Sequence, residues 1–318
     1  MKKAIKTFFQ WLLVVVLATL IITTCWHHYM CSQELDKYPT PPYGERILVN
    51  GSYMVYDVKG ADNDKTIVLL PGLGSTSPVL EFKELSSALS ARYRVITIEP
   101  FGYGFSDDTV DERTVSHIAS DINSLLEQIG VDQYYLMGHS IAGIYSVYLA
   151  NQKPDAVLGF IGIDPSVPHQ DEYDPVPVIG STFLNKVAID LEMAKNFIGI
   201  NRLIYKLSPM KEPGLTDEEN EIMTYLTLNR VGNSTLQDEM DRIDSNLSKV
   251  KNLKFPETVP VLNFVASSNT ELMPEWEQLH RDVITETEKS KVVVLQGQHY
   301  LHQDNLENIV NGVFEWVG

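Results

Sequence analysis

The sequence predicts an α/β fold in which helices cover both faces of a mostly parallel central sheet. From Thr66 onward, short apolar runs with strand character alternate with segments of helical period. The runs are apolar along their whole length, as expected of parallel strands buried on both faces. This alternation stops at Pro165 and resumes at Val259. We therefore expect one α/β domain that carries a helical insertion.

The elements before the central strand follow in a regular order. Two strand-like runs, 46–50 and 53–59, flank Gly51-Ser52, which is typical of a hairpin turn. The elements expected next are a strand (66–70), a helix (79–90), a strand (94–98) and a helix (115–129). Gly130 directly after the last helix is a common terminator.

A strand, a turn of small residues and a helix then follow each other. The apolar run 134–137 indicates a buried strand, and 144–151 has helical character. Between them, Gly138-His139-Ser140-Ile141-Ala142 matches a Gly-x-Ser-x-Gly turn, with alanine in place of the second glycine. Such a turn raises the serine hydroxyl clear of the backbone and directs the helix N-terminus at it. Ser140 is therefore the candidate nucleophile.

The second half of the chain interrupts and then completes the sheet. Residues 165–256 have mainly helical period, and we expect them to form a cap inserted into the α/β domain, which spans 45–318. The other expected elements are strands at 158–164, 259–266 and 291–295, and a closing helix at 305–317.

The N-terminal segment, residues 1–30, differs from the rest in composition. Lys2, Lys3 and Lys6 precede an apolar run from Phe8 to Thr24. A run of about 17 residues is at the lower limit for spanning a bilayer. The basic flank predicts a single-pass anchor in the cell membrane, with the catalytic domain outside the cytoplasm. The alternative is a signal segment that is cleaved, which would release a secreted protein. The polar, proline-rich residues 31–44 are expected to form an extended linker.

Charge and cysteine content exclude several classes of function. A net charge of −17 would repel nucleic acid, so we expect no nucleic-acid partner. The two cysteines, Cys25 and Cys31, lie at the end of the N-terminal segment. The folded domain therefore has no cysteine for a disulfide, a metal site or a nucleophile.

A glycine-rich loop, Phe101-Gly102-Tyr103-Gly104-Phe105-Ser106, raises the question of phosphate binding. No Gly-Lys-[Ser/Thr] follows it, and the spacing of a dinucleotide fingerprint is absent. We predict that these residues form a structural loop beside the substrate pocket. We expect neither a cofactor nor a metal.

Together these motifs resemble a known family. They are Pro71-Gly72-Leu73-Gly74, the glycine-rich loop, the serine turn and Gly297-Gln298-His299-Tyr300. In this order they make residues 45–318 similar to the α/β-hydrolase fold family, in its serine-nucleophile (esterase- and lipase-like) branch. The resemblance implies a catalytic triad in the order serine, acid, histidine.

The candidate base is His299. A serine needs a base because its hydroxyl is barely ionised at neutral pH. His299 follows the last expected strand, at the carboxyl edge where active-site loops collect, and the family's catalytic histidine occupies the matching place. His302 is the rival, expected rather to begin a helix or contact the cap.

The candidate acid has two alternatives. The family usually places it after the strand that follows the cap, where this sequence has Asn269, whose neutral amide would stabilise the histidine charge poorly. Some members place it after the strand that follows the nucleophile helix, where Asp164 lies. We favour Asp164, with Glu271 as the alternative acid, and a site in which Asn269 or no residue fills the role stays open.

The oxyanion of a tetrahedral intermediate needs backbone N–H donors already in place. Ile141 N–H follows the nucleophile, and the resemblance implies Leu73 N–H as the second donor. Many relatives begin that loop with His-Gly, and Pro71 stands here instead of the histidine.

These observations lead to two functional hypotheses. The first is a membrane-anchored serine hydrolase that cleaves a carboxylic ester, thioester or amide of a small or moderately apolar acyl substrate through an acyl-enzyme. The second is a non-catalytic binding or interaction protein that keeps the hydrolase fold, motivated by Asn269 and Pro71.

Overall fold

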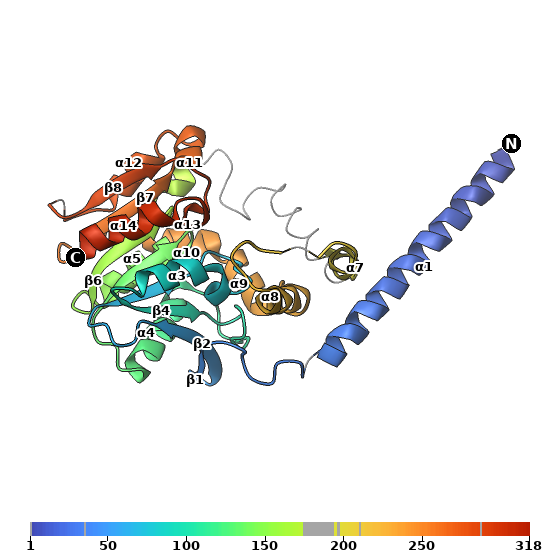
Figure 1. Cartoon of the computed structure of the whole chain (residues 1–318). Coiled ribbons are helices and arrows are strands. Elements are labelled where there is room, and N and C mark those ends of the chain that lie inside the picture. Colours follow the sequence, from blue (N-terminus) through green and yellow to red (C-terminus); the bar gives the residue numbers. More distant parts are fainter. Residues whose placement is uncertain (1, 35, 174–193, 196–197, 210, 287) are drawn as a thin grey trace.

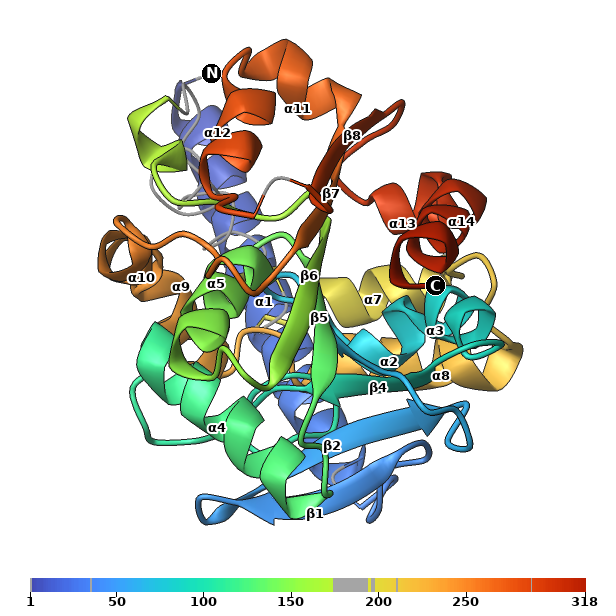
Figure 2. The same ribbon diagram turned by 90° about the vertical axis from the view of Figure 1, so that its left-hand side faces the viewer.

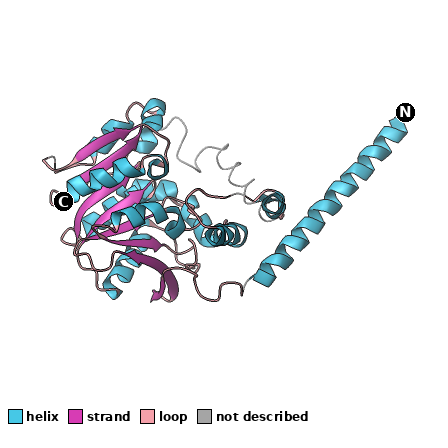
Figure 3. Cartoon of the chain, in the orientation of Figure 1, coloured by secondary structure: helices cyan, strands magenta, loops and turns pink. Residues whose placement is uncertain are grey.

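The computed structural model shows a central sheet between two helical layers, with a long N-terminal helix beside them (Figure 1). It describes all residues except 1, 35, 174–193, 196–197, 210 and 287. Strands and helices alternate through most of the domain, and helices fill the described part of the block before the last two strands (Figure 3).

The sheet has eight strands in the order β1-β2-β4-β3-β5-β6-β7-β8. The pairs β1·β2 and β2·β4 are antiparallel, and all other pairs are parallel. The sheet is mostly parallel, as predicted. The strands are β1 (Glu45–Val49), β2 (Ser52–Lys59), β3 (Thr66–Leu70), β4 (Arg94–Glu99), β5 (Tyr134–His139), β6 (Val157–Ile163), β7 (Val261–Ala266) and β8 (Lys291–Leu295).

Helices cover both faces of the sheet, which explains why the central strands are apolar along their length (Figure 2). Every residue of β3 and β7 is buried. One face packs against α3 (Lys83–Leu89) and α14 (Leu306–Val317), and the other against α4 (Val115–Gln128) and α5 (Ala142–Gln152). Two apolar cores, one on each face, therefore stabilise the sheet, and the candidate site lies at one edge of it.

The helix expected over 79–90 is interrupted in the structure. Phe82 separates α2 (Pro78–Glu81) from α3 (Lys83–Leu89). Ser77 caps α2 by accepting a hydrogen bond from Leu80 N–H, and Pro78 occupies the first helical position. The break leaves Glu81 at the end of α2, a position that matters for the site.

Among the described residues of the block between β6 and β7, every regular element is a helix. These helices are the 3-10 helix η1 (Gln170–Glu172) and the α-helices α7 (Ile200–Leu207), α8 (Asp217–Asn229), α9 (Ser234–Asp241) and α10 (Ile243–Val250). Part of the predicted cap, residues 174–193, lies outside the described residues. The end of the block packs on the domain itself, because Ile243, Leu247 and Val250 of α10 belong to the same core as α4 and α5.

The N-terminal helix α1 (Lys2–Glu34) continues past the apolar run. The linker expected at 31–44 is therefore wrong at its start, since Cys31 to Glu34 are helical and contact the helical block. An 18-residue window within Ile5–Glu34 has a mean hydropathy of 2.2, and none of that window is buried. By length and composition this helix can cross a membrane, as an anchor or as a signal sequence.

Candidate active site

Ser140 lies on a strained turn between β5 and α5, with a φ of +52°. A residue other than glycine adopts this conformation only where its surroundings enforce it. Here the carbonyl oxygen of Ser140 accepts hydrogen bonds from Gly143 N–H at 2.9 Å and Ser166 N–H at 2.7 Å. A Cβ atom at position 143 would lie 2.2 Å from the carbonyl oxygen of Ser166, so glycine is required there. The turn is as tight as the sequence pattern predicts.

The sheet topology brings the candidate triad residues to one edge. Ser140 follows β5, Asp164 directly follows β6, and His299 comes shortly after β8. Since β5, β6, β7 and β8 are parallel neighbours, their carboxyl ends meet at the same edge.

His299 and Asp164 are joined by a short hydrogen bond. His299 Nδ1 lies 2.6 Å from Asp164 Oδ2, and the Asp164 side chain is fully buried while that of His299 is 31% exposed. This contact fixes the Nδ1–H tautomer and leaves Nε2 free to act on a substrate or a nucleophile.

Three further donors surround the Asp164 carboxylate. Oδ1 accepts hydrogen bonds from Ala266 N–H at 3.0 Å and from the Trp276 indole N–H at 2.9 Å. Oδ2 also accepts a hydrogen bond from the side-chain amide of Asn269. These donors offset the cost of burying the carboxylate in its charged form.

The other candidate acids lie elsewhere or act differently. Glu271, on α11 (Ser267–Leu272), is exposed and forms no hydrogen bond or ion pair with any described residue. Asn269 supports Asp164 rather than contacting His299. Of the candidates for the acid, the structure therefore places only Asp164 on His299, within the described part of the chain.

The residue before Ser140 contacts His299, and the Pro71–Gly74 loop approaches Ser140. His139, which precedes Ser140, donates from Nε2 to the carbonyl oxygen of His299 at 3.1 Å, and the two rings lie 4.7 Å apart. A Cβ atom on Gly72 would lie 3.3 Å from Ser140 Cβ, so this loop approaches the nucleophile closely.

The two expected oxyanion donors have free N–H groups. Among the described residues, neither Leu73 N–H nor Ile141 N–H has a hydrogen-bond acceptor. Ile141 has helical dihedral angles and begins α5, so its N–H belongs to the helix N-terminus. The arrangement can stabilise negative charge that develops beside Ser140.

A second cluster of titratable side chains lies behind the serine turn. Glu81 Oε1 lies 3.5 Å from His302 Nε2 and 4.0 Å from His139 Nδ1. These three atoms, and His302 Nδ1, have no hydrogen-bond partner among the described residues. One ligand atom from each of the three residues lies within 4.8 Å of the others. Among the described residues, this cluster therefore has the spacing that could hold a metal ion.

Burial dominates the ionisation of this second cluster. It raises the pKa of Glu81 to about 7, although the hydrogen bond from Ser75 opposes the shift. Burial and the neighbouring His299 lower the pKa of His302 to about 4 and hold that of His139 well below its ordinary value. His302 packs against Phe82, with ring centroids 4.9 Å apart, and does not contact Asp164.

The glycine-rich loop is organised around the buried Glu99 carboxylate. Glu99 accepts hydrogen bonds from Phe105 N–H at 2.8 Å, Ser77 Oγ at 3.0 Å and Tyr43 Oη at 2.9 Å. Burial raises the pKa of Glu99 to about 7. A Cβ atom on Gly104 would collide with this carboxylate, at 2.0 Å, so the loop needs glycine for close packing.

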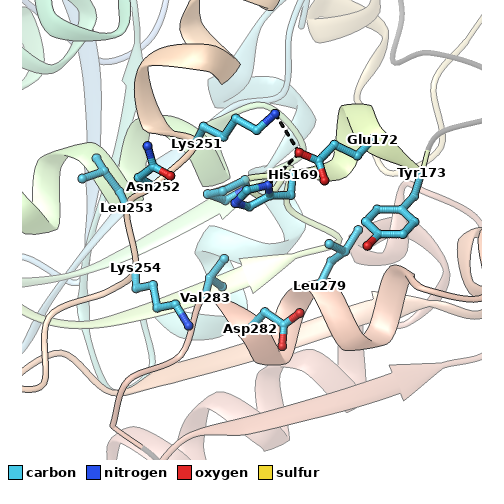
Figure 4. Close-up of a pocket in the computed structure, with 11 residues that line it drawn as sticks. His169, Glu172, Tyr173, Lys251, Asn252, Leu253, Lys254, Leu279, Asp282 and Val283 are labelled. Atoms are coloured by element: carbon cyan, nitrogen blue, oxygen red, sulfur yellow. Dashed lines mark hydrogen bonds and ion pairs between the residues drawn. The ribbon is translucent and has the colours of Figure 1, made fainter.

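Figure 4 shows a surface hollow of about 360 Å³ that is lined by residues other than the candidate triad. It is bordered by the segment around η1, by residues 251–254 and by α12 (Trp276–Asp282). Glu172 bridges Lys251 at 2.7 Å and His169 at 3.1 Å on one side of it. None of Ser140, Asp164 and His299 lines this hollow.

Sequence reasoning missed the residues that support the acid. Trp276 gives no local signal, because its hydrogen bond to Asp164 joins positions that are far apart in the sequence. The Glu81 cluster likewise depends on three separate segments. Asn269 occupies the position where the family usually carries the acid, and in this structure its side-chain amide donates a hydrogen bond to Asp164.

Comparison with known proteins defines the class of this chain. The model of the α/β hydrolase fold matches residues 65–201. The uncharacterized protein YbdG of Bacillus subtilis is 28% identical over 272 residues, which cover 84% of this chain and 81% of YbdG. RutD of Yersinia enterocolitica, provisionally named a carbamate hydrolase, is 28% identical over 114 residues, so the chain spans only 40% of its length.

Solved structures share the whole architecture at low sequence identity. The epoxide hydrolase VrEH1 from Vigna radiata superposes with a TM-score of 0.64 at 21% identity, covering 86% of this chain and 96% of that one. Cfl2 from Burkholderia cenocepacia gives 0.66 at 16% identity, with 87% and 99% covered. At such identities the likeness shows the fold alone.

Sheet order, turn geometry and the family match over residues 65–201 agree, and the chain has the α/β-hydrolase fold. RutD and VrEH1, two of the similar proteins, are named as hydrolases.

Proposed function

We propose that this protein is a membrane-anchored serine hydrolase that cleaves a carboxylic ester through an acyl-enzyme. The observation that carries the proposal is the hydrogen bond between His299 Nδ1 and the buried, donor-supported Asp164, at the sheet edge where Ser140 is raised. Thioesters and amides react through the same intermediate and are included in the proposal.

Each residue has a defined role in this mechanism. His299 Nε2 takes the proton of Ser140 as its Oγ attacks the substrate carbonyl. Leu73 and Ile141 N–H groups stabilise the oxyanion, and His299 then gives its proton to the leaving alcohol. Water, activated by His299, attacks the acyl-enzyme in the second half of the reaction. Asp164 remains anionic and stabilises the imidazolium.

The nucleophile separates this proposal from epoxide hydrolysis, although the fold is shared with an epoxide hydrolase. A serine at the turn forms an acyl-enzyme with a carbonyl substrate, whereas opening an epoxide in this way requires a carboxylate nucleophile. Ser140 therefore favours carbonyl substrates.

The rival hypothesis, a binding protein without catalysis, has lost part of its motivation. It depended on Asn269 at the usual acid position, and Asn269 donates to Asp164 in this structure. The second motive was Pro71. Even with proline at this position, the loop backbone at Gly72 lies close to Ser140.

A fluorophosphonate probe tests the proposal directly, because it reacts only with an activated serine. We expect labelling of the full chain in detergent and none for Ser140→Ala. Turnover of a p-nitrophenyl ester is expected to fall with His299→Ala. A folded wild-type protein that neither labels nor turns over esters would favour the binding protein.

The anchor and its orientation are part of the proposal. The basic residues Lys2, Lys3 and Lys6 favour an N-terminus in the cytoplasm and a catalytic domain on the outer side. Protease added to intact spheroplasts is expected to digest the domain, and carbonate extraction is expected to leave the chain in the membrane. Release of a shortened, soluble chain would instead indicate a cleaved signal sequence.

A further inference from the structure

The end of α1 is fastened to the helical block by buried polar contacts. Arg202, on α7, is 6% exposed, and its guanidinium group contacts both carboxylate oxygens of Glu34, at 2.7 and 2.8 Å. Its Nε also donates to His27 Nδ1 at 3.2 Å, and Asn229 of α8 donates to Glu34 at 3.0 Å. A buried guanidinium needs these acceptors, so the contact is specific rather than incidental.

Helix α7 also lies close against the backbone of α1. A Cβ atom on Gly199 would be 2.7 Å from both the Thr23 carbonyl oxygen and His27 Cβ. At the other end of α7, Lys206 Nζ lies 5.4 Å from the centre of the Trp26 ring. Figure 1 shows α7 between the α/β domain and α1.

These contacts set the depth of α7 relative to a bilayer that α1 would span. The apolar run ends at Thr24. Thr23, Trp26 and His27 lie within roughly 5 Å of that point along the helix axis. The polar interface on each side of a bilayer is on the order of 5–7 Å thick. Helix α7 is therefore at the height of the lipid headgroups, where an amphipathic tryptophan such as Trp26 is favoured.

At this height α7 exposes an apolar face. Leu203, Ile204 and Leu207 are 39%, 46% and 77% exposed. They lie on a different face of the helix from Arg202 and Lys206, which contact α1. Exposed leucine and isoleucine on a short cationic helix are typical of helices that lie in a membrane interface.

We propose that α7 is an interfacial helix, with Leu203, Ile204 and Leu207 inserted into the acyl boundary of the bilayer that α1 spans. The inference rests on the proposed membrane anchor. The occupant of the apolar face is lipid, and the helical block is thereby held on the membrane surface. The hydrolase then meets amphiphilic acyl substrates that reside in the bilayer, which narrows the substrate class.

A photo-crosslinking experiment tests the contact. The full chain is reconstituted in phosphatidylcholine nanodiscs, with p-benzoylphenylalanine introduced at Leu207. We expect lipid adducts by mass spectrometry. The matched control carries the same group at Val110, which is fully exposed on a loop of the α/β domain, and adducts there should be at least about tenfold fewer.

A variant with three asparagines, Leu203→Asn, Ile204→Asn and Leu207→Asn, tests the consequence. The substituted positions are exposed, so the fold should be retained. We expect kcat/KM for an ester dissolved in the nanodisc to fall about fivefold, because the helical block loses its lipid contact. Turnover of water-soluble p-nitrophenyl acetate should stay within about twofold, since the triad is untouched.

The outcomes distinguish this inference from the proposed function. Lipid adducts at position 207 without any ester turnover by the wild type would leave the docking correct and the hydrolase proposal wrong. Ester turnover with no adducts at 207 above the Val110 control would overturn the docking. Loss of the chain from the membrane on carbonate extraction would overturn both the anchor and the docking.

Discussion

Two carboxylate–histidine clusters lie side by side at the carboxyl edge of the sheet, and they differ in their hydrogen-bond donors. Asp164 is fully buried but receives hydrogen bonds from Ala266, Asn269 and Trp276, as well as His299. The Glu81 side chain is 14% exposed, and Ser75 is its only hydrogen-bond donor among the described residues.

The comparison shows how surroundings decide what a buried carboxylate can do. Four donors occupy the oxygens of Asp164, which holds the carboxylate in place to accept the N–H of His299 and orient the ring. Glu81 lacks such support, and burial raises its pKa to about 7. Proximity to a histidine is therefore insufficient to make a carboxylate the acid of a triad.

The largest effect is expected from Asp164→Asn. An amide can present its oxygen or its NH2 group to His299, but it cannot stabilise the charged ring. We expect kcat for an ester substrate to fall about 10⁴-fold, as loss of the correct tautomer does in serine proteases. Glu271→Gln is the control and should retain near wild-type turnover, because Glu271 is exposed and has no described partner. The opposite ranking would reject Asp164 as the acid.

The next effect concerns stability and is specific to the Glu81 cluster. Glu81 has a pKa of about 7 when folded, against an ordinary value of 4.5. Between these values the unfolded chain releases a proton that the folded chain keeps, so the free energy of unfolding falls as pH rises. The loss reaches about 3 kcal/mol above pH 7 and is absent below pH 4.5.

Glu81→Gln should remove this dependence. Thermal unfolding of both proteins in detergent, from pH 4.5 to 8, is the measurement. We expect the variant to gain stability relative to the wild type as pH rises. His302 has a pKa of about 4, so its protonation destabilises the fold at acid pH. Both proteins contain His302, so its contribution largely cancels in the difference between their stabilities. A constant difference across the range would show that Glu81 does not titrate there.

A smaller effect is expected from Trp276→Phe, which removes one donor from Asp164 and leaves the ring in place. A hydrogen bond to a charged group contributes about 1.5–3 kcal/mol, so we expect kcat to fall about tenfold to a hundredfold. Trp316→Phe is a matched control, because the Trp316 indole N–H donates to the Lys289 carbonyl on the far side of the domain. Equal effects of the two changes would indicate general destabilisation instead of support of the acid.

The sequence was informative where the signal is local. Ser140 and His299 lie in short motifs next to strands, and the strand–helix alternation predicts the sheet and its two helical layers. The sequence favours Asp164 as the acid but leaves Glu271 and Asn269 as alternatives, because the choice depends on which loop meets His299 after folding. The break at Phe82 and the helix that continues to Glu34 also depend on tertiary contacts, which override local preference.

The hydrogen bonds around the serine turn have a consequence for how activity is lost on warming. The Ser140 carbonyl oxygen accepts a hydrogen bond from Ser166 N–H, after β6, at 2.7 Å, and Ser140 N–H donates to the carbonyl oxygen of Ile163, the last residue of β6, at 3.3 Å. The segments that carry Ser140 and Asp164 thus share backbone hydrogen bonds, whereas the hydrogen bonds that join His299 to this unit, among the described residues, are those to Asp164 and from His139. We expect this loop to detach first, so that heat inactivation precedes the cooperative melting of the sheet.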